Sequence, residues 1–356
     1  MTDTSPLASD LVARARAAVD AITSGDRIAA ARAITWLEDA APIAPHLLSA
    51  LMPHTGRAFR IGVTGPPGAG KSTLVDRLAV DCRRRGLRVG ILSVDPSSPF
   101  TRGALLGDRV RMNAATSDPG VFMRSMASRG ALGGLARATV EAADVLDALG
   151  QDVIFFETVG VGQSELEVSR GADVTCVVLT PESGSGVQMI KAGLMEVADI
   201  LVVNKADRPG AERMEAELLD FLDIVGSGAL MRGRYGALTP TGATPWEVPV
   251  LKTTATEDAG VSELVEACLR YRAWLEATGI WSQRRVRQAR ARLREMIASR
   301  IEEAVWARPA HAALLDRLAG EVVEGAVPAF DAASAFLDQV WNGSARAHSV
   351  CTGERT

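Results

Sequence analysis

The sequence predicts an α/β fold in which a mostly parallel, doubly wound sheet carries helical extensions at both ends. Through the middle of the chain, short apolar runs typical of buried parallel strands alternate with longer helical segments. Strands and helices that alternate in this way form a parallel sheet covered on both faces. In residues 7–52 and beyond Thr278 only helical patterns occur. Hydrophobic residues make up 47% of the chain and aromatic residues only 4%, which suits helices packed on a sheet better than a β-sandwich.

Two or three short helices are expected first, over residues 7–52, because apolar residues recur there at helical spacing. Strands are then expected at 60–64, 88–94, 153–157, 174–179, 200–203 and 248–252. Helices between and after these strands are expected at 74–85, 132–149, 187–197, 211–225 and 261–274. Residues 226–245 are rich in Gly and Pro and predict an irregular surface segment, to which the sequence assigns no role. The last helices are expected at 284–306, 310–318 and 329–341, before a loose end at 342–356.

These patterns divide the chain into three predicted parts: an N-terminal helical extension (1–56), an α/β domain (57–277) and a C-terminal helical arm (278–356). The arm carries more apolar side chains than a solitary helical tail can bury, which is typical of subunit contacts. These side chains are Val322, Val323, Val327, Phe330, Phe336, Leu337, Val340 and Trp341. The arm therefore predicts a homodimer.

Charge and composition argue against several classes of protein. The formal net charge is −4, the wrong sign for a protein whose main ligand is nucleic acid. No apolar run approaches the roughly 20 residues that cross a bilayer, so no membrane span is predicted. The cysteines form no CxxC pair, which argues against a disulfide framework or a zinc ribbon. Acidic residues near the N-terminus fit no targeting signal, and we expect a cytoplasmic protein.

A phosphate-binding loop follows the first expected strand. Its sequence GPPGAGKS satisfies the pattern GxxxxGK[ST] and lies between a strand and a helix, as the motif requires. The glycines let backbone N–H groups surround a phosphate, the lysine reaches the β- and γ-phosphate oxygens and the serine ligates Mg²⁺. The predicted nucleotide-binding residues here are Gly65, Pro66, Pro67, Gly68, Ala69, Gly70, Lys71, Ser72 and Thr73.

A second motif indicates which base is bound. Asn204, Lys205 and Asp207 form the pattern NKxD directly after an expected strand, at the edge of the sheet where ligands of open α/β folds bind. A carboxylate at Asp207 accepts hydrogen bonds from guanine N1–H and the N2 amino group, donors that adenine lacks there. The predicted ligand is therefore GTP or GDP. Three residues after the last expected strand are predicted to close over the base: Thr254, Ala255 and Thr256.

Several acids follow other expected strands. Glu157 ends the strand at 153–157 and Gly160 follows it, the layout of a loop that senses the γ-phosphate. Glu157 stands where Asp is more usual and would reach the Mg²⁺ shell directly or through water, while the N–H of Gly160 would face the γ-phosphate. Asp95 and Asp108 supply further carboxylates for a cation that prefers oxygen ligands. The predicted metal ligands are Ser72, Asp95, Asp108 and Glu157.

Six segments together resemble the MeaB/ArgK-type G proteins, which are GTPase chaperones of adenosylcobalamin-dependent acyl-CoA mutases such as methylmalonyl-CoA mutase. They are GPPGAGKST at 65–73, VDPSSP at 94–99, LLGDRVRM at 105–112, ETVGVGQSE at 157–165, ESGSGVQMIKAGLMEVAD at 182–199 and NKAD at 204–207. The resemblance extends over about residues 7–341 and is weakest in the C-terminal third. The segment at 157–165 is the most specific, because ordinary Ras-like GTPases carry Asp-xx-Gly there. The chain departs from the family pattern at Ser185 and Gly186, where many members carry an acidic pair.

The resemblance implies a GTP-hydrolysing core with a C-terminal dimerisation arm. It also implies that hydrolysis is coupled to loading of adenosylcobalamin into the mutase and to removal of damaged cofactor, so that adenosylcobalamin would meet this chain only through its partner. The implied catalytic residues are Lys71, Asp95, Glu157, Gln163 and Lys191. Gln163 and Lys191 would lie in segments that sense the nucleotide and signal to the mutase. We expect hydrolysis to be slow until that partner stimulates it.

Two other classes of protein fit parts of the sequence. A P-loop kinase of small molecules would share the phosphate loop, but it gains nothing from a carboxylate placed for guanine. A GTPase that inserts nickel into an apo-enzyme would carry clustered His and Cys ligands. The histidines are instead remote from one another in sequence and form no ligand-spaced group with the cysteines: His46, His54, His311 and His348.

Overall fold

The computed structural model of the chain describes residues 6–96, 115, 117–128, 134–158, 171–182, 194–225 and 244–351. The chain forms two compact units, Met1–Gln288 and Ala289–Thr356. The boundary between them falls within one helix, α13 (Ile280–Trp306). The three parts proposed from the sequence, with divisions after residues 56 and 277, stay a prediction.

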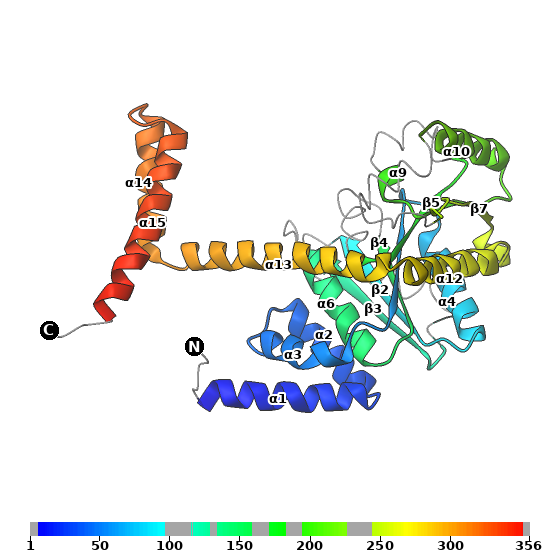
Figure 1. The fold of residues 1–356 in the computed structure, drawn as a ribbon, viewed down its shortest axis with the longest axis horizontal. Helices are drawn as coiled ribbons and strands as arrows, with labels where there is room; N and C mark the ends of the chain where they lie inside the picture. The colour runs from blue at the N-terminus through cyan, green and yellow to red at the C-terminus, as the bar shows by residue number, and fades with distance from the viewer. Residues whose placement is uncertain are drawn as a thin grey trace. The chain divides into compact units, whose positions relative to one another are not determined.

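The first unit is built on a sheet of seven parallel strands in the order β3-β2-β4-β1-β5-β6-β7 (Figure 1). The strands are β1 (Phe59–Thr64), β2 (Val89–Pro96), β3 (Val121–Ser128), β4 (Val153–Thr158), β5 (Val174–Leu179), β6 (Ile200–Asn204) and β7 (Val250–Thr253). This confirms the predicted parallel α/β fold. Strand β3 was not predicted, because it lies at the edge of the sheet, where several half-exposed residues such as Arg124 interrupt the apolar run.

Helices connect the strands, and three more precede the first one. They are α1 (Pro6–Thr23), α2 (Arg27–Glu38), α3 (Ala44–Leu51), α4 (Lys71–Arg84), α6 (Gly134–Ala148), α9 (Leu194–Val197), α10 (Ala211–Val225) and α12 (Val261–Thr278). Short 3-10 helices occur at η1 (Met52–His54) and η3 (Ala255–Glu257). Of the helix expected at 187–197, only α9 lies within the described residues. Asp26 shows why α2 begins where it does, since its side chain accepts hydrogen bonds from the backbone N–H groups of Ile28 and Ala29.

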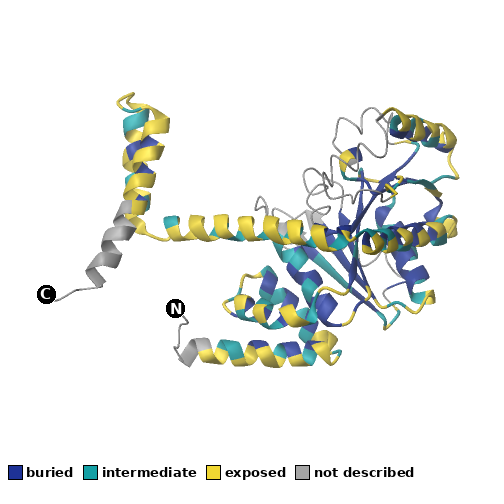
Figure 2. Ribbon diagram, in the orientation of Figure 1, coloured by how far each residue is buried: buried dark blue, intermediate teal, exposed yellow. Residues whose placement is uncertain are grey.

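Successive residues of the central strands enter two different hydrophobic cores. In β4, Phe155 packs into the core that contains side chains of α4 and α12, while Phe156 packs into the core that contains α6 and the N-terminal helices. Ile91 and Leu92 of β2 divide in the same way, because neighbouring side chains of a strand point to opposite faces. The central strands are accordingly buried on both faces (Figure 2).

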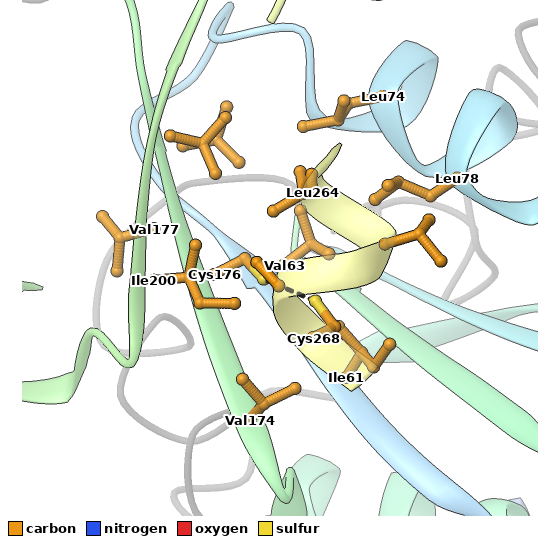
Figure 3. Close-up of a cluster of buried hydrophobic side chains, with 14 of the residues drawn as sticks. Ile61, Val63, Leu74, Leu78, Val174, Cys176, Val177, Ile200, Leu264 and Cys268 are labelled. Atoms are coloured by element: carbon orange, nitrogen blue, oxygen red, sulfur yellow. Dashed lines mark hydrogen bonds between the residues drawn. The ribbon is translucent and has the colours of Figure 1, made fainter. Parts of the chain in front are cut away.

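Cysteines contribute to the first of these cores. Cys176 of β5 and Cys268 of α12 face each other with their sulfur atoms 3.7 Å apart, among apolar side chains such as Ile61 and Leu264 (Figure 3). Contact with Cys176, together with burial, raises the pKa of the Cys268 thiol, and burial raises the pKa of Cys82 to about 12. The thiols of Cys268 and Cys82 therefore stay protonated at neutral pH and pack as small apolar groups.

The second unit consists of the rest of α13 together with α14 (Pro309–Val323) and α15 (Ala329–Cys351). Leu318, Ala332, Phe336 and Val340 form its small core. Helix α15 continues to Cys351, so the loose end expected from residue 342 was placed too early; no proline interrupts the helix there. Over the described residues, no helix is both long enough and apolar enough to cross a membrane.

Candidate nucleotide site

The phosphate-binding loop joins β1 to α4 and is shaped by glycines. Gly65 has a φ of +143°, and a Cβ atom there would lie 2.0 Å from the carbonyl oxygen of Val178 on β5. Gly70 has a φ of +83°, and a Cβ atom there would lie 2.5 Å from Nδ2 of Asn204. Only glycine permits both the conformation and the close approach. The loop leads into the N-terminus of α4, which is favourable for a phosphate.

Lys71 begins α4 and is only 5% exposed. Its Nζ atom donates hydrogen bonds of 2.9 Å to the carbonyl oxygens of Gly65 and Pro66. The ammonium group therefore lies against the loop that the motif assigns to the phosphates. Pro67 and Gly68, by contrast, are exposed.

Glu157 lies at the carboxyl end of β4, next to the phosphate loop, and is 1% exposed. The hydroxyl group of Ser72 donates a short hydrogen bond to its Oε1 atom, and the hydroxyl group of Ser93 donates one of 2.8 Å to its Oε2 atom. The strand register explains why Glu157 contacts these serines. Glu157 is paired with Ser93 of β2 and with Val63 of β1, the strand that leads into the phosphate loop. Ser93 was not among the predicted site residues, because its signal in the sequence is a lone hydroxyl group within a buried strand.

The groups around Ser72 fit a magnesium ion. A hydroxyl oxygen and a carboxylate lie in direct contact at the start of α4, and both are hard oxygen ligands of the kind Mg²⁺ prefers. A serine hydroxyl that donates its hydrogen to Glu157 still keeps lone pairs for a cation. Of the other predicted ligands, Asp95 is described only as part of the backbone of β2, and Asp108 lies outside the described residues.

Asn204 ties the base-recognition motif to the phosphate loop. Its Nδ2 atom donates a hydrogen bond of 2.8 Å to the carbonyl oxygen of Ala69. Its Oδ1 atom accepts hydrogen bonds from the hydroxyl group of Thr253, at 3.0 Å, and from the N–H of Ala255, at 3.3 Å. Asn204 is 2% exposed, so these bonds are shielded from water. Thr253 is a second residue that the sequence analysis missed, one position before the expected 254–256 segment.

The remaining residues of the NKxD motif form a turn after β6. Lys205 has a φ of +58°, and the N–H of Ala206 donates a 3.0 Å hydrogen bond to the carbonyl oxygen of Thr253. Asp207 is exposed at this edge of the sheet, where a base can reach it.

Glu182, which the sequence analysis did not single out as a site residue, lies next to this turn. Its carboxylate is 3.7 Å from Nζ of Lys205 and accepts a short hydrogen bond from Arg208. The bond from Arg208 lowers the pKa of Glu182, so the carboxylate stays ionised at neutral pH. Glu182 thus partly neutralises Lys205 of the base-recognition motif and the neighbouring Arg208.

The predicted segment 254–256 follows β7. Thr254 donates its N–H to the carbonyl oxygen of Ala259, Ala255 is 4% exposed and Thr256 is exposed. Other predicted or singled-out residues lie outside the described residues: Gly160, Gln163, Ser185, Gly186 and Lys191.

A parallel sheet with a GxxxxGK[ST] loop after β1 and an NKxD motif after β6 defines a P-loop GTPase, an enzyme that hydrolyses GTP to GDP and phosphate. The family described as methylmalonyl-CoA mutase-associated GTPase MeaB matches residues 30–310, and the chain belongs to this family.

Similar proteins agree with this classification. A protein from Pyrococcus abyssi that is named as a GTPase is 46% identical over 287 residues, covering 81% of this chain and 81% of that protein. A mitochondrial methylmalonic aciduria type A homolog from Caenorhabditis elegans is 31% identical over 273 residues, covering 76% of this chain and 65% of that protein. The crystal structure of an LAO/AO transport system kinase aligns with a TM-score of 0.69 and 27% identity, covering 92% of this chain and 98% of that one.

Proposed function

We propose that this GTPase is a cytoplasmic chaperone of an adenosylcobalamin-dependent acyl-CoA mutase, either methylmalonyl-CoA mutase or a close relative. In this role GTP hydrolysis is coupled to loading of adenosylcobalamin, to its protection or to reactivation of the mutase. The observation that carries the proposal is the family match, which includes the whole nucleotide site from the phosphate loop to the NKxD motif. The name of the relative from Caenorhabditis elegans, which refers to methylmalonic aciduria, supports the same partner.

The nucleotide site is proposed to work with Mg²⁺. Ser72 and Glu157 would hold the ion, together with Asp95 and Asp108, and Lys71 would bind the β- and γ-phosphate oxygens. The ion supplies positive charge to the phosphate oxygens when it is bound. The hydrogen bonds of Asn204 support a fixed distance between the base and phosphate subsites, because one buried side chain contacts both segments.

A kinase of small molecules is the alternative that the name of the solved neighbour raises. A kinase would use the same phosphate loop, and it differs in needing a second substrate. The NKxD turn favours the GTPase, since Asp207 is exposed where a guanine edge would lie.

Affinity capture is the direct test of the proposed partner. The full chain, immobilised with GDP or with a non-hydrolysable GTP analogue, is expected to retain an acyl-CoA mutase from extracts of its native cell at physiological salt. The bound proteins would be identified by mass spectrometry, and cobalamin in the eluate by its absorbance. A Lys71→Ala chain, which should bind the phosphates poorly, is the matched control for dependence on nucleotide. Absence of any cobalamin-binding enzyme with either nucleotide would contradict the proposal.

The second unit is proposed to form a homodimer. Of its apolar residues, Phe336 and Val340 pack inside the unit, whereas Val323 is 88% exposed and Phe330 is 82% exposed. Leu337 and Trp341 are also exposed. A three-helix unit that keeps such side chains at its surface is typical of a surface covered by another subunit.

Charged substitutions in this surface are expected to dissociate the dimer. Changing Val323 and Phe330 together to Asp should weaken self-association by about tenfold or more, since buried apolar contacts at an interface would be replaced by buried charges. Analytical ultracentrifugation over a range of concentrations measures this. Ile224→Asp is the control, because Ile224 is 85% exposed but belongs to α10 in the first unit. A double variant that associates like the unchanged chain would place the interface elsewhere.

A further inference from the structure

Ser93 is a polar residue inside an otherwise apolar strand. It lies in the middle of β2 with no exposed surface, between Leu92 and Val94, which are both buried. A buried hydroxyl group loses its contacts with water and needs a partner to offset that cost. The partner of Ser93 is Glu157, whose Oε2 atom accepts its hydrogen at 2.8 Å. Ser93 is therefore directed at a carboxylate that also accepts a hydrogen bond from Ser72, at the end of the phosphate loop.

The two hydroxyl groups hold opposite oxygens of this carboxylate. Ser72 donates to Oε1 and Ser93 donates to Oε2, and the two serines come from different elements, α4 and β2. A carboxylate fixed at both oxygens cannot rotate about its terminal bond without breaking one of the two bonds. Each oxygen still keeps a lone pair that neither serine uses. The bonds thus fix the direction of Glu157 without consuming its capacity to bind a cation.

The hydrogen bond from Ser93 matters because the carboxylate belongs to a glutamate, which is longer than an aspartate. A glutamate has one more rotatable bond than the aspartate that is more usual at this position, so it loses more conformational freedom when it is ordered. Ser93 is placed to reduce that loss before a cation arrives, because it lies beside Glu157 in the neighbouring strand. Groups that orient a metal ligand in this way commonly affect metal affinity although they do not touch the metal.

We propose that Ser93 is a positioning residue of the magnesium site, which holds Oε2 of Glu157 so that Oε1 stays against Ser72. The inference rests on the proposed roles of Ser72 and Glu157 as metal ligands. It assigns to Ser93 an effect on Mg²⁺ affinity rather than on nucleotide affinity. A purely structural serine would instead change the stability of the fold and leave the Mg²⁺ requirement unchanged.

The test is the Mg²⁺ concentration that the full chain needs for tight GDP binding. Ser93→Ala is expected to raise it by about 10- to 100-fold, the usual effect of removing a group that orients a metal ligand, while GDP affinity in EDTA stays unchanged. Binding is followed by calorimetry or with a fluorescent GDP analogue. Thr175→Val is the matched control, because Thr175 is also fully buried in the sheet but its hydroxyl group makes no hydrogen bond with any residue that the structure describes. If the Ser93→Ala chain fails to fold, the Ser93→Cys chain is measured instead. The thiol of cysteine is a weaker donor than a hydroxyl group, so this variant should raise the Mg²⁺ requirement severalfold.

A double-mutant cycle with Glu157→Gln shows whether Ser93 acts through Glu157. Once Glu157 is changed, Ser93→Ala should alter the Mg²⁺ requirement by less than about twofold, since the group that it positions has lost its charge. A Ser93→Ala chain with the Mg²⁺ requirement of the unchanged chain overturns the inference and leaves the proposed GTPase site intact. If GDP binding by the unchanged chain does not depend on Mg²⁺ at all, the proposed metal site fails, and the role of Ser93 fails with it.

Discussion

ATP is expected to bind this chain about 10⁴-fold more weakly than GTP, the scale on which a site built around buried hydrogen bonds rejects a ligand that cannot form them. The side chain that discriminates is Asp207, whose carboxylate can accept from two guanine donors that adenine lacks. The chain before Asp207 is held by the side-chain hydrogen bonds of Asn204, and the N–H of Arg208 closes the turn by donating to the carbonyl oxygen of Lys205 at 3.0 Å. A carboxylate offers no donor to N1 of adenine, which is itself an acceptor.

Asp207→Asn should shift the preference from guanine toward xanthine nucleotides. An asparagine offers one donor and one acceptor in place of two acceptors, and xanthine presents a carbonyl oxygen where guanine has its amino group. Calorimetric titration with GTP, ATP and xanthosine triphosphate measures all three affinities. Asp223→Asn is the matched control, because Asp223 is an exposed acid of α10 and the charge change is the same. Equal affinity of the unchanged chain for ATP and GTP would refute the guanine assignment and favour the kinase.

The sequence predicts those parts of the site whose geometry depends on residues close together in the chain. The phosphate loop is one example, because the conformations of Gly65 and Gly70 follow from a single turn between β1 and α4. Ser93 and Thr253 could not be found in this way. Each acts through a partner in a neighbouring strand, Glu157 or Asn204, and the register that brings them together becomes visible only in the folded sheet.

The fold shows the same division between local and non-local information. Central strands such as β4 are buried on both faces and can be recognised from an unbroken apolar run. Among the described strands, the edge strand β3 pairs only with β2 and has half-exposed residues, so its sequence lacks that signal. The end of α15 was placed too early for a different reason: Asn342 and Gly343 are residue types common at helix ends, but the helix continues through them.

Intrinsic GTP hydrolysis should be slow, and a partner mutase should accelerate it by about 10³- to 10⁵-fold, the range that a missing cation at the γ-phosphoryl group accounts for. Lys71 is the cation that the phosphate loop supplies. Two further cations at this edge of the sheet, Lys205 and Arg208, are paired with Glu182. Glu157 adds negative charge beside the loop. The negative charge that develops on the phosphate oxygens therefore needs a cation besides these residues. We expect the partner to order a loop that carries such a cation to the γ-phosphate.

The proposed source of that cation is Lys191 or one of Arg102, Arg109 and Arg111, all of which lie outside the described residues. Lys191 is tested first, because it belongs to the family segment 182–199. Lys191→Ala should leave GTP affinity nearly unchanged and remove most of the acceleration, since the cation would act on the transition state rather than on the bound substrate. Steady-state hydrolysis is measured with and without the mutase. Lys252→Ala is the matched control, because the ammonium of Lys252 pairs with Glu215 on α10. Hydrolysis that is already fast without the mutase would show that no further cation is needed. A Lys191→Ala chain that the mutase accelerates fully would show that the cation comes from another residue.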